Sequence, residues 1–400
     1  MPDSADPRAP QGRPARREPL PFSPPDIGQA EIDEVVDSLR SGWITTGHKV
    51  KRFEADFAAY VGCPHAVALN SATAGLFLGL KALGIGPGDE VITTPYTFAA
   101  TINVILHAGA TPVLADVRRE DFNIDPAAVA AAVTPRTRAV IPVHFAGRPC
   151  DMDAIGALAA RHGLAVVEDA AHAIGAEHRG RRIGTLSALT VFSLHAVKNV
   201  TTAEGGMVCT ADQGLADRIR VMALHGMNKD AWKRFATGGT WRYDIVELGY
   251  KHNMTDLQAA IGIHQLAKVE RFRERRLAIV RRYRAGLGDL PQLTLPGDTA
   301  DGRHAWHLFP VLLDPDRLAV DRDRFIGLLA ERNITANVHY IAAHLFSYYR
   351  DVHGYQPGDF PVAEWLSDRE VTLPLYTRLT DDDVDDVIAA VRGIITANTR

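Results

Sequence analysis

The sequence predicts an α/β fold, in which a large αβα sandwich domain with a mostly parallel sheet is followed by a smaller α+β domain. Between residues 65 and 210, short β-rich runs alternate with helical segments. These runs are apolar at almost every position, which is typical of strands covered on both faces by helices. A chain of 400 residues also exceeds what one small core organises, so two domains are expected.

The expected strands are short, and each is followed by a turn or a helical segment, as a parallel sheet requires. Acidic residues mark some helix starts: Asp151 and Asp153 open a helix over 151–162, and Asp256 lies early in a long helical stretch over 255–285. The seven expected strands are, in order, HAVAL (65–69), EVITT (90–94), TPVLADV (111–117), AVIPVHF (139–145), LAVVED (164–169), LTVFSL (189–194) and GMVCT (206–210).

The stretch over 255–285 is apolar at its start and rich in arginine later, so we expect it to leave the large domain and enter the small one. The runs AWHLFPVLL (305–313) and ITANVHY (334–340), with a final helix after Thr380, indicate the small α+β domain. The expected organisation is a disordered leader over 1–20, a large domain over 21–270 whose first segment can pack on the small domain, and a small domain over 271–400.

Composition excludes several classes of protein. The net charge is −4 and no sustained run of Lys or Arg occurs in the folded part, so we expect no nucleic-acid partner. No run reaches the roughly 18 apolar residues of a membrane span. Cys63, Cys150 and Cys209 are far apart and lack metal spacing, which predicts free buried thiols and no metal site. The Pro- and Arg-rich leader has no apolar stretch, and we therefore expect a cytoplasmic protein.

Polar residues gather where the expected strands end, which is where open α/β sheets bind ligands. After the strand that stops at Asn70, the small residues Ser71, Ala72 and Thr73 begin a helix, whose free N–H groups suit a phosphate. Simple capping by Ser71 or Thr73 is the alternative. Another apolar strand ends in Glu168 and Asp169, with His172 three residues on.

A carboxylate at a buried strand end needs a cation or hydrogen-bond donors. For Asp169, a protonated pyridine nitrogen is one candidate partner, and a helix cap or a structural ion pair is the alternative. Lys198 lies 29 residues later in an otherwise uncharged stretch, with Ser193 and His195 before it. A lysine shielded by apolar neighbours loses its proton more readily and can attack an aldehyde, which is the requirement of Schiff-base chemistry, although a solvated surface lysine is the common case.

Taken together, these segments resemble the DegT/DnrJ/EryC1/StrS family of sugar aminotransferases, which are fold-type I enzymes that use pyridoxal 5′-phosphate (PLP). Within the family the chain is most similar to the UDP-4-amino-4-deoxy-L-arabinose–oxoglutarate aminotransferase subgroup. The matching segments are SGWITTGHKVKRFE (41–54), SATAGL (71–76), GDEVITTPYTFAAT (88–101), PVHFAGRPCDMDAI (142–155), VVEDAAHAIGA (166–176), FSLHAVKNVTTAEGG (192–206), GYKHNMTDLQAA (249–260) and HAWHLF (304–309).

The resemblance implies roles for these residues. Lys198 would hold PLP through a Schiff base, Asp169 would pair with its pyridine nitrogen, and His172 would lie near its ring oxygen or on the ring face opposite Phe98. Ala72, Thr73 and Ser193 would bind the phosphate. Asn253, with Lys251 as a second candidate, would reach into the site of a neighbouring subunit in a homodimer. The implied contacts to the sugar nucleotide are Trp43, Thr45, Gly47, Tyr96 and His339, for which turns and ordinary packing are the alternative.

The resemblance also implies a reaction in two halves. L-Glutamate would give its amino group to the cofactor, leaving pyridoxamine 5′-phosphate (PMP), which would then aminate a nucleotide-linked keto sugar, at C4 in the subgroup. One lysine serves both halves, so ping-pong kinetics are expected. Three alternatives stay open: amination of another keto sugar or keto-cyclitol, a deoxygenation that the presence of Lys198 disfavours, and a non-catalytic regulator of the same fold.

Overall fold

The computed structural model describes residues 16–228, 243–299 and 301–400. Its centre is a seven-stranded sheet of order β1-β9-β8-β5-β4-β2-β3, in which every neighbouring pair from β8 to β3 is parallel and β9 runs antiparallel to both β1 and β8. The strands are β1 (His65–Leu69), β2 (Glu90–Thr93), β3 (Thr111–Leu114), β4 (Thr137–Ile141), β5 (Ala165–Asp169), β8 (Leu189–Ser193) and β9 (Gly206–Thr210). The seven strands expected from the sequence are therefore confirmed.

Helices cover both faces of this sheet, because alternate residues of each strand are apolar on opposite sides. Val67, Val191 and Val208 pack against one layer, whereas Ala66, Phe192 and Cys209 face the other. The first layer consists of α3 (Ala72–Ala82), α4 (Ala100–His107) and α7 (Gln213–Ala223), and the second includes α2 (His48–Val61), α5 (Pro126–Ala132), α6 (Met152–His162) and α8 (Asp256–Leu266). The predicted αβα sandwich is thus confirmed.

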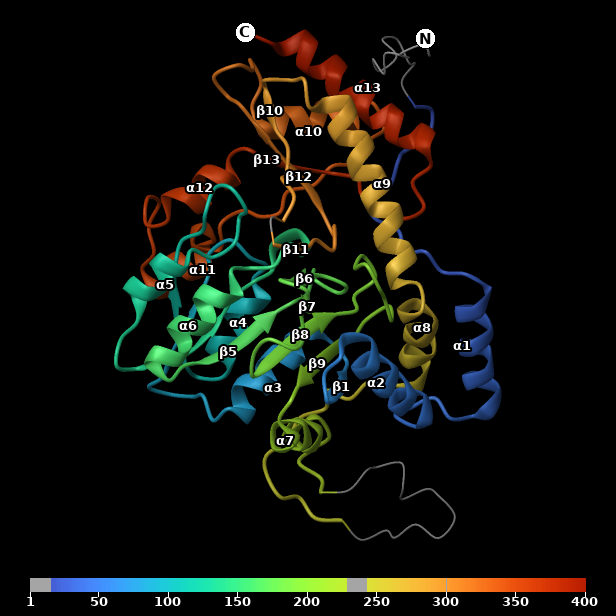
Figure 1. Ribbon diagram of the computed structural model, residues 1–400, viewed down its shortest axis with the longest axis vertical. Helices are drawn as coiled ribbons and strands as arrows, with labels where there is room; N and C mark the ends of the chain where they lie inside the picture. The colour runs from blue at the N-terminus through green and yellow to red at the C-terminus, as the bar shows by residue number, and fades with distance from the viewer. Residues whose placement is uncertain (1–15, 229–242, 300) are drawn as a thin grey trace.

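The small domain is built on a second sheet of three strands, β10 (Leu293–Thr294), β12 (Phe309–Leu313) and β13 (Glu370–Leu373). Its core includes Phe309, Phe325 and Val391, all fully buried. The helices α9 (Val269–Leu287), α10 (Arg322–Ala330) and α13 (Asp381–Asn398) pack on this sheet, and α11 (Ser347–His353) and α12 (Pro361–Ser367) follow α10. Figure 1 shows α9 running from the large domain to the small one.

One predicted helix differs from the structure. The stretch over 255–285 forms two helices, because α8 ends at Leu266 and α9 begins at Val269. The break falls where Gln265 and Lys268 both donate hydrogen bonds to the buried carboxylate of Glu31 in α1 (Gln29–Ser41). Tertiary contact with α1 therefore accompanies the break, and no Pro or Gly marks it in the sequence.

The N-terminal segment packs on the small domain. Leu20 is buried in the small-domain core, and Arg16 forms ion pairs with Asp383 and Asp386 of α13. Residues 16–20 therefore have defined contacts, whereas the rest of the predicted leader, 1–15, lies outside the described residues. A third sheet joins the domains: β11 (Gly302–Arg303) pairs with β6 (Glu177–His178), which pairs with β7 (Arg181–Arg182).

Three general features follow from the described residues. The cysteines Cys63, Cys150 and Cys209 are buried and free. Among the described helices, none combines the length and apolar character that crossing a bilayer would demand. Within the same residues, no group of three or more His, Cys, Asp or Glu side chains is arranged to hold a metal ion.

Candidate active site

Asp169 is the last residue of β5, and its carboxylate is buried at the carboxyl end of the sheet. Its Oδ2 accepts a hydrogen bond of 2.8 Å from the Thr101 hydroxyl, and its Oδ1 accepts one of 3.1 Å from the Ala171 N–H. Burial raises the pKa of Asp169, while these donors and the charge of Lys198 oppose the rise. A buried carboxylate with a raised pKa is stabilised by a cation at this position.

Lys198 lies in the loop between β8 and β9, where its backbone N–H donates to the His195 carbonyl. Burial lowers the pKa of Lys198 to about 8, although the charge of Asp169 acts in the opposite direction. Each of the two side chains affects the pKa of the other, so the strand end and the loop bring them to one place. An amine with this pKa has a substantial neutral, nucleophilic fraction near neutral pH.

His172 is buried beside them. Burial and the charge of Lys198 lower its pKa well below the ordinary histidine value, which favours the neutral ring. Its Nε2 is 3.2 Å from the hydroxyl of Tyr340, a residue of the small domain, and its ring centre is 4.3 Å from that of His307. Its Nδ1 has no hydrogen-bond partner among the described residues. An unpartnered buried ring nitrogen indicates a place for a ligand group.

The predicted phosphate residues lie at the start of α3. Ser71 caps this helix by accepting a hydrogen bond from the Ala74 N–H, so the capping alternative is correct for Ser71. Ala72 and Thr73 form the first turn, and Thr73 is exposed. Gly206 of β9 approaches this turn so closely that a Cβ would lie 2.5 Å from the Ala72 nitrogen. The absence of a side chain there keeps the helix N-terminus accessible.

The remaining predicted cofactor contacts lie at three places. Ser193 ends β8, is partly buried, and accepts a 3.4 Å hydrogen bond from the His195 N–H. Phe98 is 65% exposed, and its ring centre lies 6.5 Å from that of Tyr340. Asn253 forms an isolated bridge with Leu69 at the edge of β1. Exposure of so large an aromatic side chain beside this site is consistent with a ligand or a partner surface covering Phe98.

The residues predicted to bind the sugar nucleotide lie at two separate places, and the first is the contact between Tyr96 and His339. Tyr96 is fully buried, and its hydroxyl donates to the His339 carbonyl at 2.8 Å, so the structure does not bring it to an open surface. The ring of His339 is held by Thr372 through Nδ1 at 2.9 Å. Burial and the charge of Lys198 lower the pKa of His339 to about 3. Tyr96 and His339 therefore fasten the small domain to the end of the large sheet.

The other predicted sugar-nucleotide contacts form a loop over 43–47, before α2. Trp43 is partly buried, and its indole N–H donates to the Thr46 carbonyl at 3.2 Å, while Thr45 is exposed. The Asn253 amide donates to the Thr46 hydroxyl at 2.7 Å. Thr46 and Asn253 also line a cavity of about 530 Å³ between α2, β1 and α7, which Lys198 does not line.

Two residues near His172 were not expected from the sequence. Tyr340 supplies the hydroxyl that contacts His172, and His307 packs against the His172 ring while its own Nδ1 lies 3.0 Å from the Asn199 amide oxygen. Both lie far along the chain from His172, so local pattern carries no sign of the contact. The sequence could have indicated them only through the segment HAWHLF, which contains His307, and the pair His339-Tyr340. Both place polar aromatic residues within apolar runs.

The model of the DegT/DnrJ/EryC1/StrS aminotransferase family matches residues 25–392. The chain is 52% identical to the spore coat polysaccharide biosynthesis protein SpsC of Bacillus subtilis over 377 residues, which is 94% of this chain and 97% of SpsC.

Two solved structures also superpose closely. Spr1654 of Streptococcus pneumoniae, described as a candidate sugar aminotransferase and solved in its PMP form, has a TM-score of 0.89 at 38% identity, with 94% of this chain and 99% of that chain covered. PseC of Helicobacter pylori, an aminotransferase of pseudoaminic acid biosynthesis, has a TM-score of 0.88 at 28% identity, with 95% and 100% covered. The chain therefore belongs to the DegT/DnrJ/EryC1/StrS aminotransferase family of fold-type I enzymes, and it is a PLP-dependent aminotransferase.

Proposed function

We propose that the enzyme transfers the amino group of L-glutamate to C4 of a keto sugar carried on a nucleotide. The names of similar proteins support a sugar substrate, since SpsC is named for a polysaccharide and Spr1654 and PseC are described as sugar and pseudoaminic acid enzymes. The proposal is carried by one observation: three chemically different side chains lie together at the carboxyl ends of β5 and β8. They are the amine of Lys198, the carboxylate of Asp169 and the imidazole of His172.

The residues present fit PLP. Asp169 offers a buried carboxylate for the pyridine nitrogen, and the unpartnered Nδ1 of His172 offers a polar contact beside it. Ala72, Thr73 and Ser193 would hold the phosphate at the N-terminus of α3, where Gly206 leaves room. Phe98 would cover the ring, and Lys198 would bind the aldehyde carbon. When bound, PLP acts as an electron sink that makes the proton on Cα of the donor acidic.

The chain's own residues then manage charge and protons. Asp169, held by Thr101 and Ala171, keeps a negative charge where a positive ring nitrogen is needed. Lys198, with its pKa of about 8, is suited to accept the proton from Cα of glutamate and to deliver a proton at C4 of the sugar in the second half-reaction. Because one lysine serves both halves, we expect ping-pong kinetics.

The sugar nucleotide would be received by Trp43, Thr45 and Gly47, with His339 and Tyr96 shaping the wall toward the small domain. Asn253, with Lys251 as a second candidate, would act in the site of a second subunit, so we propose a homodimer with shared sites. The second candidate for the acceptor is a keto sugar of another pathway or a keto-cyclitol. The side chains around Lys198 act on the reacting carbon and do not select the rest of the acceptor.

The decisive experiment is glutamate-dependent amination of a panel of UDP- and dTDP-linked 4-keto sugars by the PLP-loaded enzyme, with a keto-cyclitol included. We expect 2-oxoglutarate to form in step with one 4-amino sugar nucleotide. Lys198→Ala is the matched control and should form neither product. Turnover of the cyclitol alone would replace the nucleotide-sugar assignment, and 2-oxoglutarate formation by Lys198→Ala at the wild-type rate would exclude the proposed role of the lysine.

A further inference from the structure

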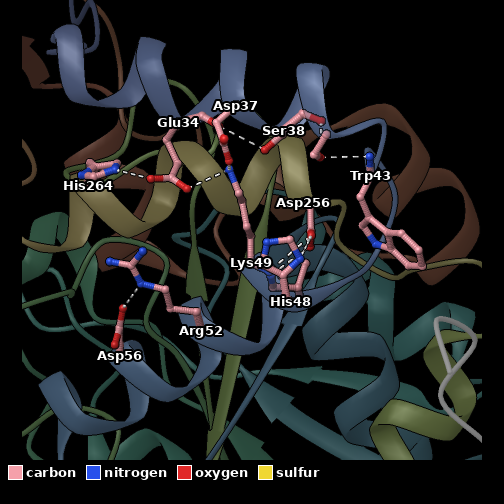
Figure 2. Close-up of polar contacts among 12 residues, drawn as sticks. Glu34, Asp37, Ser38, Trp43, His48, Lys49, Arg52, Asp56, Asp256 and His264 are labelled. Carbon is pink, nitrogen blue, oxygen red and sulfur yellow. Dashed lines mark hydrogen bonds and ion pairs between the residues drawn. The ribbon is translucent and has the colours of Figure 1, made fainter. Parts of the chain in front are cut away.

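The loop over 43–47 is held by a carboxylate from another part of the chain. Asp256, the first residue of α8, is fully buried, and its Oδ1 accepts hydrogen bonds from the N–H groups of Gly47 at 2.8 Å and Val50 at 3.0 Å. Its Oδ2 accepts one from the Lys49 N–H at 3.2 Å. The Asp256 N–H donates in turn to the Thr45 carbonyl at 3.0 Å. Figure 2 shows Asp256 beside the start of α2.

This carboxylate replaces the cap that α2 lacks. The N-cap position of α2 is Gly47, which has no side chain to satisfy the first N–H groups of the helix. Asp256 supplies the missing acceptors and places a negative charge at the positive end of the helix. The approach is close enough that a Cβ on Gly47 would lie 2.6 Å from Asp256 Oδ2 and 2.0 Å from Trp43 Nε1. Glycine is therefore needed where the loop meets Asp256.

A second set of contacts joins the loop to the residues before α8. The Thr46 hydroxyl donates to the Met254 carbonyl at 2.5 Å and accepts the 2.7 Å hydrogen bond from Asn253. One hydroxyl thus bonds the loop to the segment 253–254. Together with the contacts of Asp256, this makes the loop over 43–47 and the segment 253–256 one hydrogen-bonded unit.

The start of α2 is also fastened to α1. Lys49 is buried, and its Nζ lies 2.7 Å from Glu34 Oε1 and 2.8 Å from Asp37 Oδ2. Glu34 also lies 2.9 Å from His264 Nε2 of α8, as Figure 2 shows. The base of the loop is therefore fixed on two sides, by α8 through Asp256 and by α1 through Lys49. The exposed positions of the loop, Ile44 and Thr45, remain free to meet a ligand.

We propose that Asp256 is a positioning residue for binding of the sugar-nucleotide acceptor. Together with Thr46, it holds the loop over 43–47 in the conformation that binds the acceptor. The inference rests on the proposed function, because it takes this loop as the acceptor site. All the bonds involved are to the loop and to the start of α2, and none is to Lys198, Asp169 or His172. Loss of Asp256 should therefore weaken acceptor binding and leave the half-reaction with glutamate intact.

The test compares two pairs of variants as PLP-loaded holoenzymes. Asp256→Asn keeps the size but replaces one acceptor oxygen with an N–H₂ group, and Asp321→Asn makes the same change at the N-cap of α10, where Asp321 accepts from the Arg324 N–H. Thr46→Val removes the hydroxyl at constant shape, and Thr46→Ser retains it. UDP and dTDP are titrated by calorimetry, and the glutamate half-reaction is followed by its absorbance change in a single turnover.

We expect Asp256→Asn and Thr46→Val to weaken binding of the preferred nucleotide, and to raise the KM for its 4-keto sugar, by about tenfold, because each variant loses hydrogen bonds that hold the loop. Asp321→Asn and Thr46→Ser should bind as wild type does, and the glutamate half-reaction should stay within about twofold in all four. Equal nucleotide binding by wild type and Asp256→Asn would overturn the inference. So would an equal loss in both half-reactions, since that is the result of general destabilisation.

The two proposals fail in different ways. If the wild-type enzyme binds neither nucleotide and aminates no 4-keto sugar nucleotide, the proposed function is wrong and the inference falls with it. If the wild type binds and aminates, and Asp256→Asn does so with an unchanged KM, only the positioning role is wrong. If Asp256→Asn does not fold, Thr46→Val still tests whether the hydrogen bonds that hold the loop set acceptor binding, because it leaves the cap of α2 in place, and unchanged nucleotide binding by Thr46→Val would overturn the inference.

Discussion

At the scale of single residues, the lowered pKa of Lys198 sets how the enzyme takes up its cofactor. Burial favours the neutral amine, so the pKa is about 8. At pH 7 roughly a tenth of the side chains would be neutral, against well under a thousandth for an ordinary lysine. We expect the rate of PLP uptake by cofactor-free enzyme to rise with pH and to level off above about pH 8. Stopped-flow absorbance between pH 6 and pH 10 measures this, and a rate that still climbs tenfold per pH unit at pH 9 would contradict it.

The buried carboxylate of Asp169 is expected to lower the stability of the cofactor-free protein although amino transfer requires it. Burial raises its pKa above the unfolded value, so without a cation its ionised form lowers the free energy of unfolding at neutral pH. We expect cofactor-free Asp169→Asn to have a higher Tm than wild type at pH 7.5 and amino transfer to fall by about 100-fold or more. The Tm difference should shrink as the pH falls through the raised pKa, because protonated Asp169 no longer carries the cost. A lower Tm for the variant at pH 7.5 would show that the carboxylate stabilises the fold.

The sequence was informative about residues that lie at strand ends. Asp169, Lys198 and Ser193 could be singled out because parallel strands place their carboxyl ends at one edge of the sheet, and the family resemblance then implied their roles. Tyr340 could not be proposed, because it meets His172 through the packing of the small domain on the large one. The burial of Tyr96 could not be foreseen either, since a tyrosine at a strand end can point into the core or toward a ligand, and its role in substrate binding stays a prediction.

At the scale of elements, the contact between β9 and α3 should control cofactor affinity. A Cβ on Gly206 would lie 2.4 Å from the carbonyl of Ser71, so Gly206→Ala must separate the strand from the N-terminus of the helix. We expect PLP to bind about tenfold or more weakly, as measured by fluorescence titration. The matched control is Gly156→Ala in α6, where a Cβ meets nothing within 4 Å and should stabilise the helix by about 0.5–1 kcal/mol. Equal PLP affinity for both variants would exclude this role of the contact.

Element type was predictable where periodicity was strong. All seven strands of the large sheet could be expected, because strands buried on both faces form apolar runs between turns. The division of 255–285 into α8 and α9 could not, because it coincides with a contact to Glu31 of α1 and not with a local breaking residue. The short strands β6, β7 and β11 were also missed, since a two-residue pairing such as that of Gly302 and His178 leaves no periodic signal.

At the scale of the whole molecule, a buried arginine of the small domain positions a chain segment that packs against the large domain. Arg276 of α9 is buried, and its Nη1 donates to the carbonyls of Trp306, His307 and Leu375. Burial lowers the pKa of Arg276 to about 10. Because His307 packs on His172, this arginine fixes the chain segment that carries one wall of the active site. The position of the small domain is thus part of the geometry around the catalytic residues.

The largest claim about the whole molecule is that two copies share their active sites through Asn253, and mixing two variants that each lack one residue of the shared site tests it. Lys198→Ala lacks the lysine, and Asn253→Ala lacks the residue proposed to reach the other subunit. After the two are unfolded and refolded together in equal amounts, half of the dimers are mixed, and one site in each mixed dimer has both residues. We therefore expect activity to return to about a quarter of wild type.

The matched control mixes Lys198→Ala with Asp169→Asn. Both residues belong to the site of their own subunit, as their mutual effect on pKa indicates, so no mixed dimer has a complete site and activity should stay at the level of the separate variants. If Asn253 serves its own subunit, the first mixture will behave like this control. The comparison therefore distinguishes sharing of the site from simple pairing of two independent enzymes, because only sharing allows one defective chain to supply what the other lacks.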